Sequence, residues 1–497
     1  MADVAKQPAP PITTAPGSFV GGFRSLKEEA RVGELPLEGK LPDWLHGSLI
    51  RTGPAQWEVG EQAMRHWFDG LAMLHRFGFA SGKVSYANRF LETRAYRAAQ
   101  EKSQIVYSEF ATDPCRSLFS RISSVFSPKI SDNANVNLVE LGERFIAMTE
   151  TPIPVEFDPE TLATAGVAYE APGILTTAHP HLDRATGGML NYAAKLGPRN
   201  SYRFFSLGPS ASKPELIGKL PVREPAYMHS FGLTKRWLVL VEFPFVVNPI
   251  AIPLSGRPYI ENFRWKPERG TRLSLVDRST GKTTGPFETD PCFAFHHVNS
   301  YEQDGEVVVD VCAYDDAAIV GDLYMERLRG GSPIAEAELR RFRIRPELRS
   351  VVSERLLDEG RLELPRINYG RCNEYPYRYV WGVRNAGSGW LDTIVRADLE
   401  SRTTTAWSED GCYPGEPVFV AAPGAAEEDG GVLLSVVFDS DRGNSFLLVL
   451  DAATLCELAR AEAPHHIPYG FHGQFAPAAE QELPSRSSDK SQLLQGF

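Results

Sequence analysis

The sequence has no continuous apolar run close to the roughly 20 residues that a membrane-spanning helix needs, and residues 1–16 contain no apolar segment typical of a secretory signal. Only six of its 497 residues are cysteine, and none of them forms a C-x-x-C pair. This pattern favours free thiols in a reducing compartment over a disulfide framework. These absences predict a cytoplasmic, globular protein.

Basic residues are outnumbered by acidic residues, 52 against 63, which gives a formal net charge of -11. Non-specific binding of DNA or RNA needs an excess of Lys and Arg to neutralise phosphates, so we expect no nucleic acid partner. The sequence also contains no H-E-x-x-H motif and no G-x-S-x-G motif. Zinc-protease and α/β-hydrolase functions therefore lack their signatures.

Glycine (42 residues) and proline (37 residues) interrupt the chain too often for a helical protein. Between these interruptions lie short runs rich in Val, Ile and aromatic residues, which are typical of strands. Because several runs are continuously apolar, we expect strands that are covered on both faces. The runs are WLVLVEF (237–243), EVVVDV (306–311), YRYVWGV (377–383), VLLSVVF (432–438) and FLLVL (446–450).

An Asp-x-x-Ser/Thr pattern recurs near these runs, and it predicts tight turns because an Asp side chain can bond to the backbone just after it. It begins at Asp158, Asp183, Asp277, Asp398 and Asp451. Many antiparallel hairpins in one chain favour an all-β fold, and a β-propeller arranges them without exposed edges. A pair of β-sandwiches fits the same pattern.

Two segments have helical spacing and read as insertions in this all-β fold. Pro333 follows Ser332 and precedes IAEAELRR, which predicts a short capped helix. Residues 115–126 (CRSLFSRISSVF) place large apolar side chains on one helical face. We expect residues 1–17 and 478–497 to be mobile, with 18–477 forming a single domain.

Four of the eleven histidines occupy distinctive sequence contexts. His179 precedes a proline, His229 opens an apolar strand, and His472 lies between Phe471 and Gly473. His296 and His297 are adjacent in a strand, so they should point to opposite faces and only one can face a shared site. On a propeller, ligands to one metal would come from distant segments such as these. The remaining histidines, 46, 66, 75, 181, 297, 465 and 466, are expected to be structural.

These contexts lie within a larger set of motifs that make the chain resemble the carotenoid cleavage oxygenase family over residues 39–475. The motifs occur in the order of the family: RTGP (51–54), WFDGLAMLHRF (67–77), DNANVN (132–137), AHPHLD (178–183), AYMHSFGLT (226–234), FHHVNSYEQDG (295–305), LPRINY (364–369), GEPVFV (415–420), EEDGGVLLSVV (427–437) and IPYGFHGQF (467–475). Several of them are most similar to the animal branch, which includes β-carotene oxygenases and a retinoid isomerohydrolase.

The resemblance implies a seven-bladed β-propeller with helical and loop insertions capping one face. It also implies one Fe(II) per chain, held by His179, His229, His296 and His472. Glutamates behind the ligands match Glu150, Glu363 and Glu416. A carboxylate there would orient each imidazole and offset the charge of the metal. Three glutamates leave one histidine without such a partner, and we expect this to be His179.

The implied activity is oxidative cleavage of a carbon–carbon double bond of a carotenoid or apocarotenoid, with dioxygen as co-substrate and aldehydes such as retinal as products. No catalytic side chain beyond the metal centre is required. Cleavage of a stilbene and isomerohydrolysis of a retinyl ester are alternatives on the same scaffold. A non-catalytic carotenoid-binding propeller is a third, and the four ligand positions argue against it.

The substrate tunnel implied by the resemblance contains Phe68, Phe110, Val136 and Tyr314. Because carotenoids are nearly insoluble, we expect the protein to associate peripherally with a membrane surface and to need no obligate protein partner. The apolar face of segment 115–126 is the predicted docking site. Its residues are Leu118, Phe119, Ile122, Val125 and Phe126.

Overall fold

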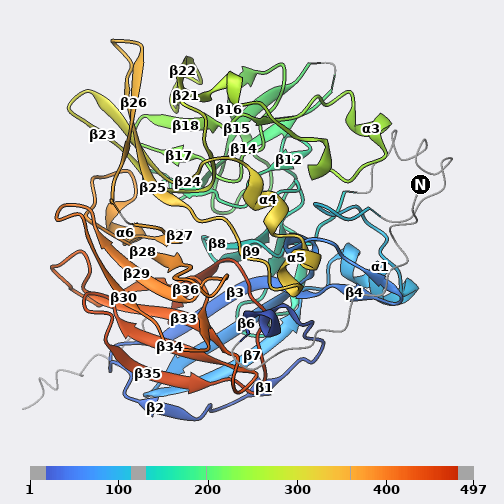
Figure 1. The fold of residues 1–497 in the computed structure, drawn as a ribbon, viewed down its shortest axis with the longest axis vertical. Coiled ribbons are helices and arrows are strands. Elements are labelled where there is room, and N and C mark those ends of the chain that lie inside the picture. Colours follow the sequence, from blue (N-terminus) through green and yellow to red (C-terminus); the bar gives the residue numbers. More distant parts are fainter. Residues whose placement is uncertain (1–17, 114–129, 198, 359, 479–497) are drawn as a thin grey trace, which may run out of the picture.

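The computed structural model describes residues 18–113, 130–197, 199–358 and 360–478, which form seven antiparallel sheets arranged as the blades of a propeller (Figure 1). The predicted seven-bladed fold is therefore confirmed. The predicted helix at 115–126, with its five docking residues, lies outside the described residues. No helix among the described residues is both long enough and apolar enough to cross a membrane.

The seven blades follow one another in chain order and are numbered from 1 to 7. Blade 1 contains β1 (Arg31–Val32), β7 (Lys83–Phe90), β6 (Leu71–Ala80), β3 (Gly47–Gln56) and β36 (Gly473–Pro477). Blade 2 contains β8 (Asn137–Leu141), β9 (Arg144–Met148), β10 (Val155–Phe157) and β11 (Thr164–Val167). Blade 3 contains β12 (Leu175–Thr176), β13 (His181–Leu182), β14 (Met189–Lys195), β15 (Ser201–Leu207) and β16 (Glu215–Pro221). Blade 4 contains β17 (Gly232–Leu233), β18 (Trp237–Glu242), β21 (Thr271–Asp277) and β22 (Thr283–Thr289).

Blade 5 contains β23 (Phe293–Gln303), β24 (Glu306–Tyr314), β25 (Glu338–Arg345) and β26 (Ser350–Arg355). Blade 6 contains β27 (Glu363–Arg366), β28 (Tyr379–Arg384), β29 (Thr393–Asp398) and β30 (Thr403–Trp407). Blade 7 contains β31 (Cys412–Pro414), β32 (Val418–Ala421), β33 (Gly431–Asp439), β34 (Asn444–Asp451), β35 (Glu457–Glu462) and β2 (Leu37–Gly39).

Two strand exchanges close the ring. The late strand β36 pairs with β3 in the first blade, and the early strand β2 pairs with β35 in the last blade. Each end of the described chain therefore completes a sheet built by the other end. Because the joints consist of backbone ladders, the ring leaves no open seam between its first and last blades.

The predicted strands and turns agree with this arrangement. The five apolar runs overlap β18, β24, β28, β33 and β34, and the middle strands are almost continuously buried, as in β18. Each predicted Asp accepts a hydrogen bond from the Ser or Thr three positions later. These turns join β10 to β11, β13 to β14, β21 to β22, β29 to β30 and β34 to β35.

The prediction of a helix after Pro333 is wrong. Residues 332–337 are irregular, and strand β25 begins at Glu338. Leu339, Phe342 and Ile344 are fully buried in β25 while Arg343 between them is not. Burial of these large side chains, worth about 1.5–3 kcal/mol each, outweighs the weak helix preference of the segment.

The insertions between strands carry the helices and two small hairpins. The helices are η1 (Phe19–Phe23), η2 (Trp67–Asp69), α1 (Arg94–Lys102), α3 (Ile252–Ser255), η3 (Ile260–Asn262), η4 (Pro267–Arg269), α4 (Ala318–Asp322), α5 (Met325–Arg329) and α6 (Tyr369–Cys372). The hairpins are β4 (Glu58–Val59) with β5 (Gln62–Ala63), and β19 (Phe245–Val246) with β20 (Arg264–Trp265). In Figure 1, α4 and α5 lie over the middle of the ring on the face that is presented.

Candidate metal centre

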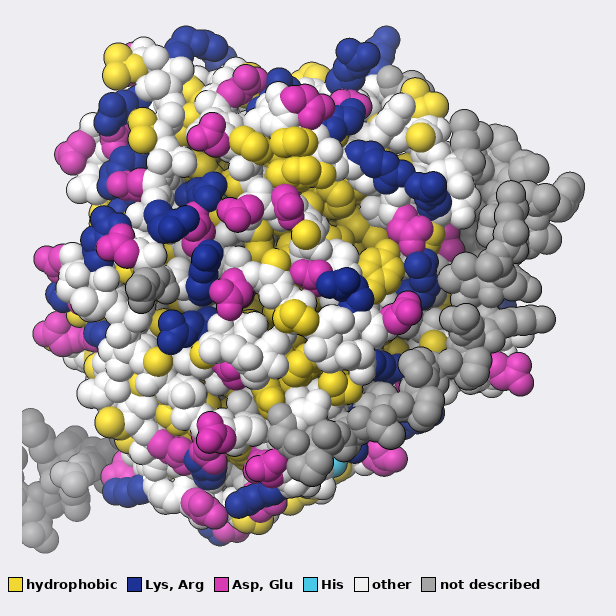
Figure 2. Space-filling model, in the orientation of Figure 1, with side chains coloured by type: hydrophobic (Ala, Val, Ile, Leu, Met, Phe, Trp, Pro, Cys, Tyr) yellow, Lys and Arg dark blue, Asp and Glu magenta, His cyan; other side chains and the backbone are white. Residues whose placement is uncertain are grey.

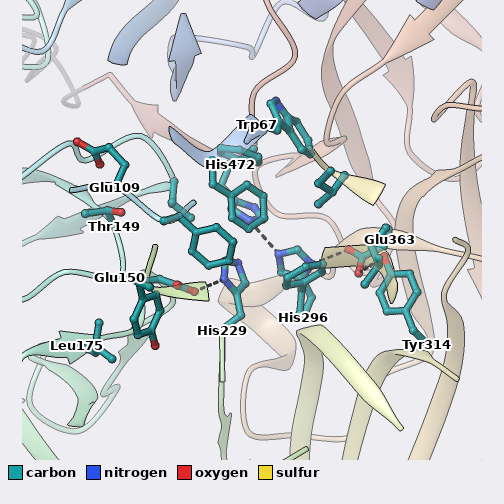
Figure 3. Close-up of a pocket in the computed structure, with 18 of the residues that line it drawn as sticks. Trp67, Glu109, Thr149, Glu150, Leu175, His229, His296, Tyr314, Glu363 and His472 are labelled. Atoms are coloured by element: carbon teal, nitrogen blue, oxygen red, sulfur yellow. Dashed lines mark hydrogen bonds and ion pairs between the residues drawn. The ribbon is translucent and has the colours of Figure 1, made fainter. Parts of the chain in front are cut away.

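The four predicted ligands come from four different blades and meet where the inner strands converge. His179 lies between β12 and β13, His229 precedes β17, His296 lies within β23, and His472 directly precedes β36. One ring nitrogen from each histidine lies within 4.8 Å of every other. Figure 3 shows His229, His296 and His472 pointing toward one another. Segments almost 300 residues apart in the chain thus form one cluster that could hold a metal ion.

Distances between these nitrogens test whether a transition metal fits. The Nε2 atoms of His179 and His229 lie 3.0 Å apart, and those of His296 and His472 lie 3.1 Å apart. With metal–nitrogen bonds of about 2.1 Å, neighbouring ligands at right angles would be about 3.0 Å apart, and tetrahedral ligands about 3.4 Å. The two measured distances therefore match a pair of neighbouring positions in an octahedral arrangement.

Three of the imidazoles are oriented by carboxylates on their other nitrogen, each at 2.6 Å. His229 Nδ1 faces Glu150, His296 Nδ1 faces Glu363 and His472 Nδ1 faces Glu416. An Nδ1–H that donates to a carboxylate leaves a lone pair on Nε2. Lone pairs about 3 Å apart repel each other unless a cation lies between them. The donor set is therefore chemically suited to a metal ion.

Each of the three glutamates is itself held by a further partner. Glu150 accepts a hydrogen bond from the Tyr227 hydroxyl at 2.8 Å, and Glu363 accepts one from the Tyr314 hydroxyl at 3.1 Å. Glu416, which is fully buried, forms an ion pair with Arg366 at 2.8 Å. These partners fix the carboxylates and hence the planes of the imidazoles. Sequence reasoning missed Arg366 and Tyr227, although Arg366 lies within the LPRINY motif.

His179 differs from the other three histidines. Among the described residues, no carboxylate bonds to its ring, in line with the expectation that one histidine has no glutamate. Its backbone N–H donates to the Thr177 hydroxyl at 3.0 Å, and this bond helps to fix its position.

Burial keeps His179, His229 and His472 in the form that can bind a metal. It lowers the pKa of His179 well below the usual value, and neighbouring imidazoles add to this shift. Burial also lowers the pKa of His472 to about 4 and lowers the pKa of His229, although Glu416 and Glu150 oppose these shifts. Neutral imidazoles with free lone pairs are therefore expected at neutral pH.

The neighbouring His297 points away from the cluster, as strand alternation predicts. Its Nδ1 lies 2.8 Å from the Ser230 hydroxyl. The remaining histidines, 46, 66, 75, 181, 465 and 466, also lie outside the four-histidine cluster. His66 and His181 each have a ring nitrogen that bonds to a backbone carbonyl. Such bonds are typical of structural histidines.

A cavity of about 1000 Å³ opens beside the cluster, and His229, His296 and His472 lie on its wall. Residues from the insertions line it as well, including Ile252, Ile319 and Leu323. Figure 2 shows hydrophobic side chains gathered in the middle of this face, with Lys, Arg, Asp and Glu around them. The cavity is large enough for a long apolar molecule.

All four residues that were predicted to form a tunnel lie on this wall: Phe68, Phe110, Val136 and Tyr314. The rings of Phe68 and Phe110 are 5.2 Å apart, and Phe68 stacks 6.3 Å from His229. The carbonyl of Val136 accepts the N–H of His472, so Val136 adjoins the cluster. Sequence reasoning missed further aromatic residues on the same wall, namely Trp67, Tyr259, Phe295, Trp390 and Phe471. Phe295 and Phe471 directly precede His296 and His472, so adjacency to a ligand was a usable signal.

Comparison with known proteins gives consistent matches over nearly the whole chain. The family model described as "RPE65: Retinal pigment epithelial membrane protein" matches residues 23–477. A carotenoid isomerooxygenase from Galleria mellonella is 35% identical over 503 residues, which cover 92% of this chain and 96% of that protein. A beta,beta-carotene 15,15'-dioxygenase from Mus musculus is 34% identical over 535 residues, which cover 95% and 94%. The crystal structure of cobalt-substituted Synechocystis ACO, an apocarotenoid oxygenase, superposes with a TM-score of 0.81 at 26% identity, covering 93% of this chain and 99% of that chain.

Proposed function

The chain belongs to the retinal pigment epithelial membrane protein family, the family of the carotenoid oxygenases, and on this premise we propose that it is an iron-dependent dioxygenase of carotenoids or apocarotenoids. In the reaction, one carbon–carbon double bond breaks and each carbon receives one oxygen atom of O₂, which gives two carbonyl products, aldehydes such as retinal. The observation that carries the proposal is the convergence of four imidazole Nε2 atoms beside a large apolar cavity.

His179, His229, His296 and His472 would hold a single Fe(II). The metal would supply dioxygen binding and activation at positions that the four nitrogens leave open. Glu150, Glu363 and Glu416 accept the Nδ1–H bonds of three ligands. In doing so they fix the tautomer and raise the basicity of those ligands.

The cavity would choose which double bond reacts by positioning the polyene. Phe68, Phe110 and Tyr314 present aromatic faces to an apolar substrate, and such faces also stabilise positive charge that develops in a polyene. The hydroxyl of Tyr314 is tied to Glu363, so its ring is held in place. Val136 adjoins His472 and would restrict access to one side of the metal.

No side chain in this arrangement needs to act as a nucleophile or a general base. Glu150 and Glu363 line the cavity, but each already accepts an Nδ1–H bond and a tyrosine hydroxyl. They are positioning residues, and substrate chemistry takes place at the metal.

Incubation with β-carotene, apocarotenals, resveratrol and a retinyl ester, in air and without oxygen, tests the function. We expect cleavage of a carotenoid or apocarotenoid only in air, with both atoms of labelled O₂ in the aldehydes. Isomerised retinol formed without oxygen would identify an isomerohydrolase, and cleavage of resveratrol alone would identify a stilbene oxygenase. Either result would refute the proposed substrate class.

A second part of the proposal concerns the source of the substrate. Carotenoids reside in membranes, so the face that carries the cavity would dock on a membrane surface. Ile174 and Ile252 line the cavity at one side, Ile174 is 41% exposed, and the neighbouring Ile250 is 68% exposed. Exposed apolar side chains at a cavity are suited to reversible membrane contact.

A further inference from the structure

The cavity extends to both sides of the histidine cluster. In Figure 3, Leu175, Thr149 and Glu109 lie on one side of the labelled histidines, and Glu363 and Tyr314 lie on the other. The second side continues along blade 6, where the wall includes Leu362, Val383 and Arg384. Here β28 ends at Arg384 and the exposed residues 386–388 follow, so the blade 6 side of the cavity ends close to solvent.

Arg384 is the uncompensated cation on this side. Among the described residues, its guanidinium has no hydrogen-bond or ion-pair partner, and its Nε is buried. Two acids lie one position from Arg384 in the strand register: Glu363, which pairs opposite Val383, and Asp392, which precedes the partner residue Thr393. The Glu363 carboxylate bonds to His296, Tyr314 and the Leu364 N–H. The Asp392 carboxylate accepts bonds from the N–H groups of Ala386 and Ser388 and from the Thr393 hydroxyl. Neither carboxylate bonds to Arg384.

The other polar groups on this side have partners. Arg361 lies 3.7 Å from Glu336 and 3.9 Å from Glu338. The side-chain oxygen of Asn385 accepts bonds from the backbone N–H groups of Gly387 and Gly389. Arg384 thus stands beside apolar side chains with a planar set of donors unused. Arg384 is half-buried and its Nε is withdrawn from water without a partner, which is unfavourable, so the position is suited to an oxygen ligand.

We propose that Arg384 binds the oxygenated end group of the substrate, and that the substrate is therefore an apocarotenoid with a terminal carboxylate or carbonyl rather than a hydrocarbon carotene. This inference rests on the proposed function and names its substrate class. The polyene would pass the histidine cluster while its end group lies against the guanidinium. A carboxylate would bind most strongly, because it accepts two parallel bonds from the arginine fork. A hydrocarbon end would leave the cation unpaired against carbon.

The test compares Arg384→Met with a matched control, Arg257→Met. Arg257 also lines the cavity and has no side-chain partner among the described residues, but it follows α3 on the other side of the ring (Figure 1). Affinity is measured without oxygen on the metal-loaded protein, from quenching of Trp67 and Trp390 fluorescence. The probes are an apocarotenoic acid, the matching apocarotenal and β-carotene. Initial rates in air give KM and kcat for the same three compounds.

We expect Arg384→Met to weaken binding of the acid by about 10- to 100-fold, and of the aldehyde by less, with kcat unchanged. Binding of β-carotene should not weaken. Arg384→Lys should recover part of the affinity for the acid, because it restores the charge but not the fork. Arg257→Met should leave the preference among the three probes as it is in the parent protein. Equal metal content and unfolding temperature of the variants establish that they are folded.

Two results would overturn the inference: an equal effect of Arg384→Met on all three probes, or the same loss of acid binding in Arg257→Met. These results are distinguishable from failure of the proposed function. If no probe is cleaved in air while the acid still binds through Arg384, the dioxygenase assignment fails and the binding site stands. If cleavage occurs but Arg384→Met does not alter the preference for the acid, only the binding site fails.

Discussion

Replacing Glu416 with Gln should weaken metal binding and should also destabilise the metal-free protein. Replacing Glu150 with Gln should only weaken metal binding. Both variants remove a negative charge behind a predicted metal ligand, which typically reduces metal affinity by about 10- to 100-fold, or about 1.4–2.7 kcal/mol. Glu416 is fully buried, however, and also forms the ion pair with Arg366. Glu150 bonds instead to the neutral hydroxyl of Tyr227.

Loss of the ion pair leaves Arg366, whose side chain is 24% exposed, without its carboxylate. Breaking a fully buried pair costs about 3–5 kcal/mol, and the partial exposure of Arg366 places the expected loss near the lower end, about 3 kcal/mol. We therefore expect Glu416→Gln to be less stable than the parent even without metal. Glu150→Gln should be close to the parent in that state.

Two measurements separate the effects. Competition with a chelator gives the affinity for Fe(II), and chemical denaturation of the metal-free proteins gives the free energy of unfolding. Equal stability of the two metal-free variants would show that the Arg366–Glu416 pair contributes nothing. Parent-like metal affinity in both variants would refute the idea that the carboxylates strengthen the histidine ligands.

Four other changes have defined outcomes. Removal of the metal with a chelator should abolish double-bond cleavage, and Fe(II) should restore it where Mg²⁺ does not, because imidazole ligands disfavour Mg²⁺; recovery with Mg²⁺ would contradict the proposed site. Burial lowers the pKa of His66 to about 3, so between pH 6.5 and 5 the unfolded chain binds a proton that the folded chain does not. This should remove about 2 kcal/mol of stability at pH 5, and His66→Asn should remove that part of the pH dependence in denaturation of the metal-free protein. Tyr314→Phe keeps the aromatic ring and loses only the hydrogen bond to Glu363, whereas Phe68→Ala removes a ring from the cavity wall. Steady-state kinetics should therefore show a smaller fall in kcat for Tyr314→Phe than for Phe68→Ala. Replacing Phe119 and Phe126 with Ser should release the protein from liposomes in a flotation assay, and unchanged binding would exclude that segment as the docking site.

Local patterns were sufficient to predict the strands and the turns, but the seven-bladed arrangement was predicted from the family resemblance, because a pair of β-sandwiches fits the same local pattern. Runs such as 446–450 are apolar at every position, and only a strand covered on both faces buries them all. The Asp turns are equally local, because each Asp bonds to a residue three positions away. Residues 332–341 misled the sequence reasoning because EAEL has helical spacing, whereas the alternation of Phe342, Arg343 and Ile344 already indicated a strand.

The candidate site was less accessible to sequence reasoning, because its contacts join distant segments. Local context singled out the four histidines, but nothing local links Glu416 to His472, 56 residues away, or Arg366 to Glu416. The glutamates were found through the family resemblance alone. Arg384 gave no signal, since an arginine at the end of a strand usually lies in water. Its lack of a partner becomes visible only when the opposite strand and the cavity are known.

The partners of the three carboxylates make the four nitrogens unequal donors. Glu150 and Glu363 are held by neutral tyrosine hydroxyls, so most of their negative charge acts on His229 and His296. Glu416 shares its charge with Arg366 and is therefore the weaker acceptor for His472. His179 has no carboxylate partner among the described residues. A metal held by these four rings would therefore be bound most firmly by His229 and His296, with His179 as the ligand most easily displaced.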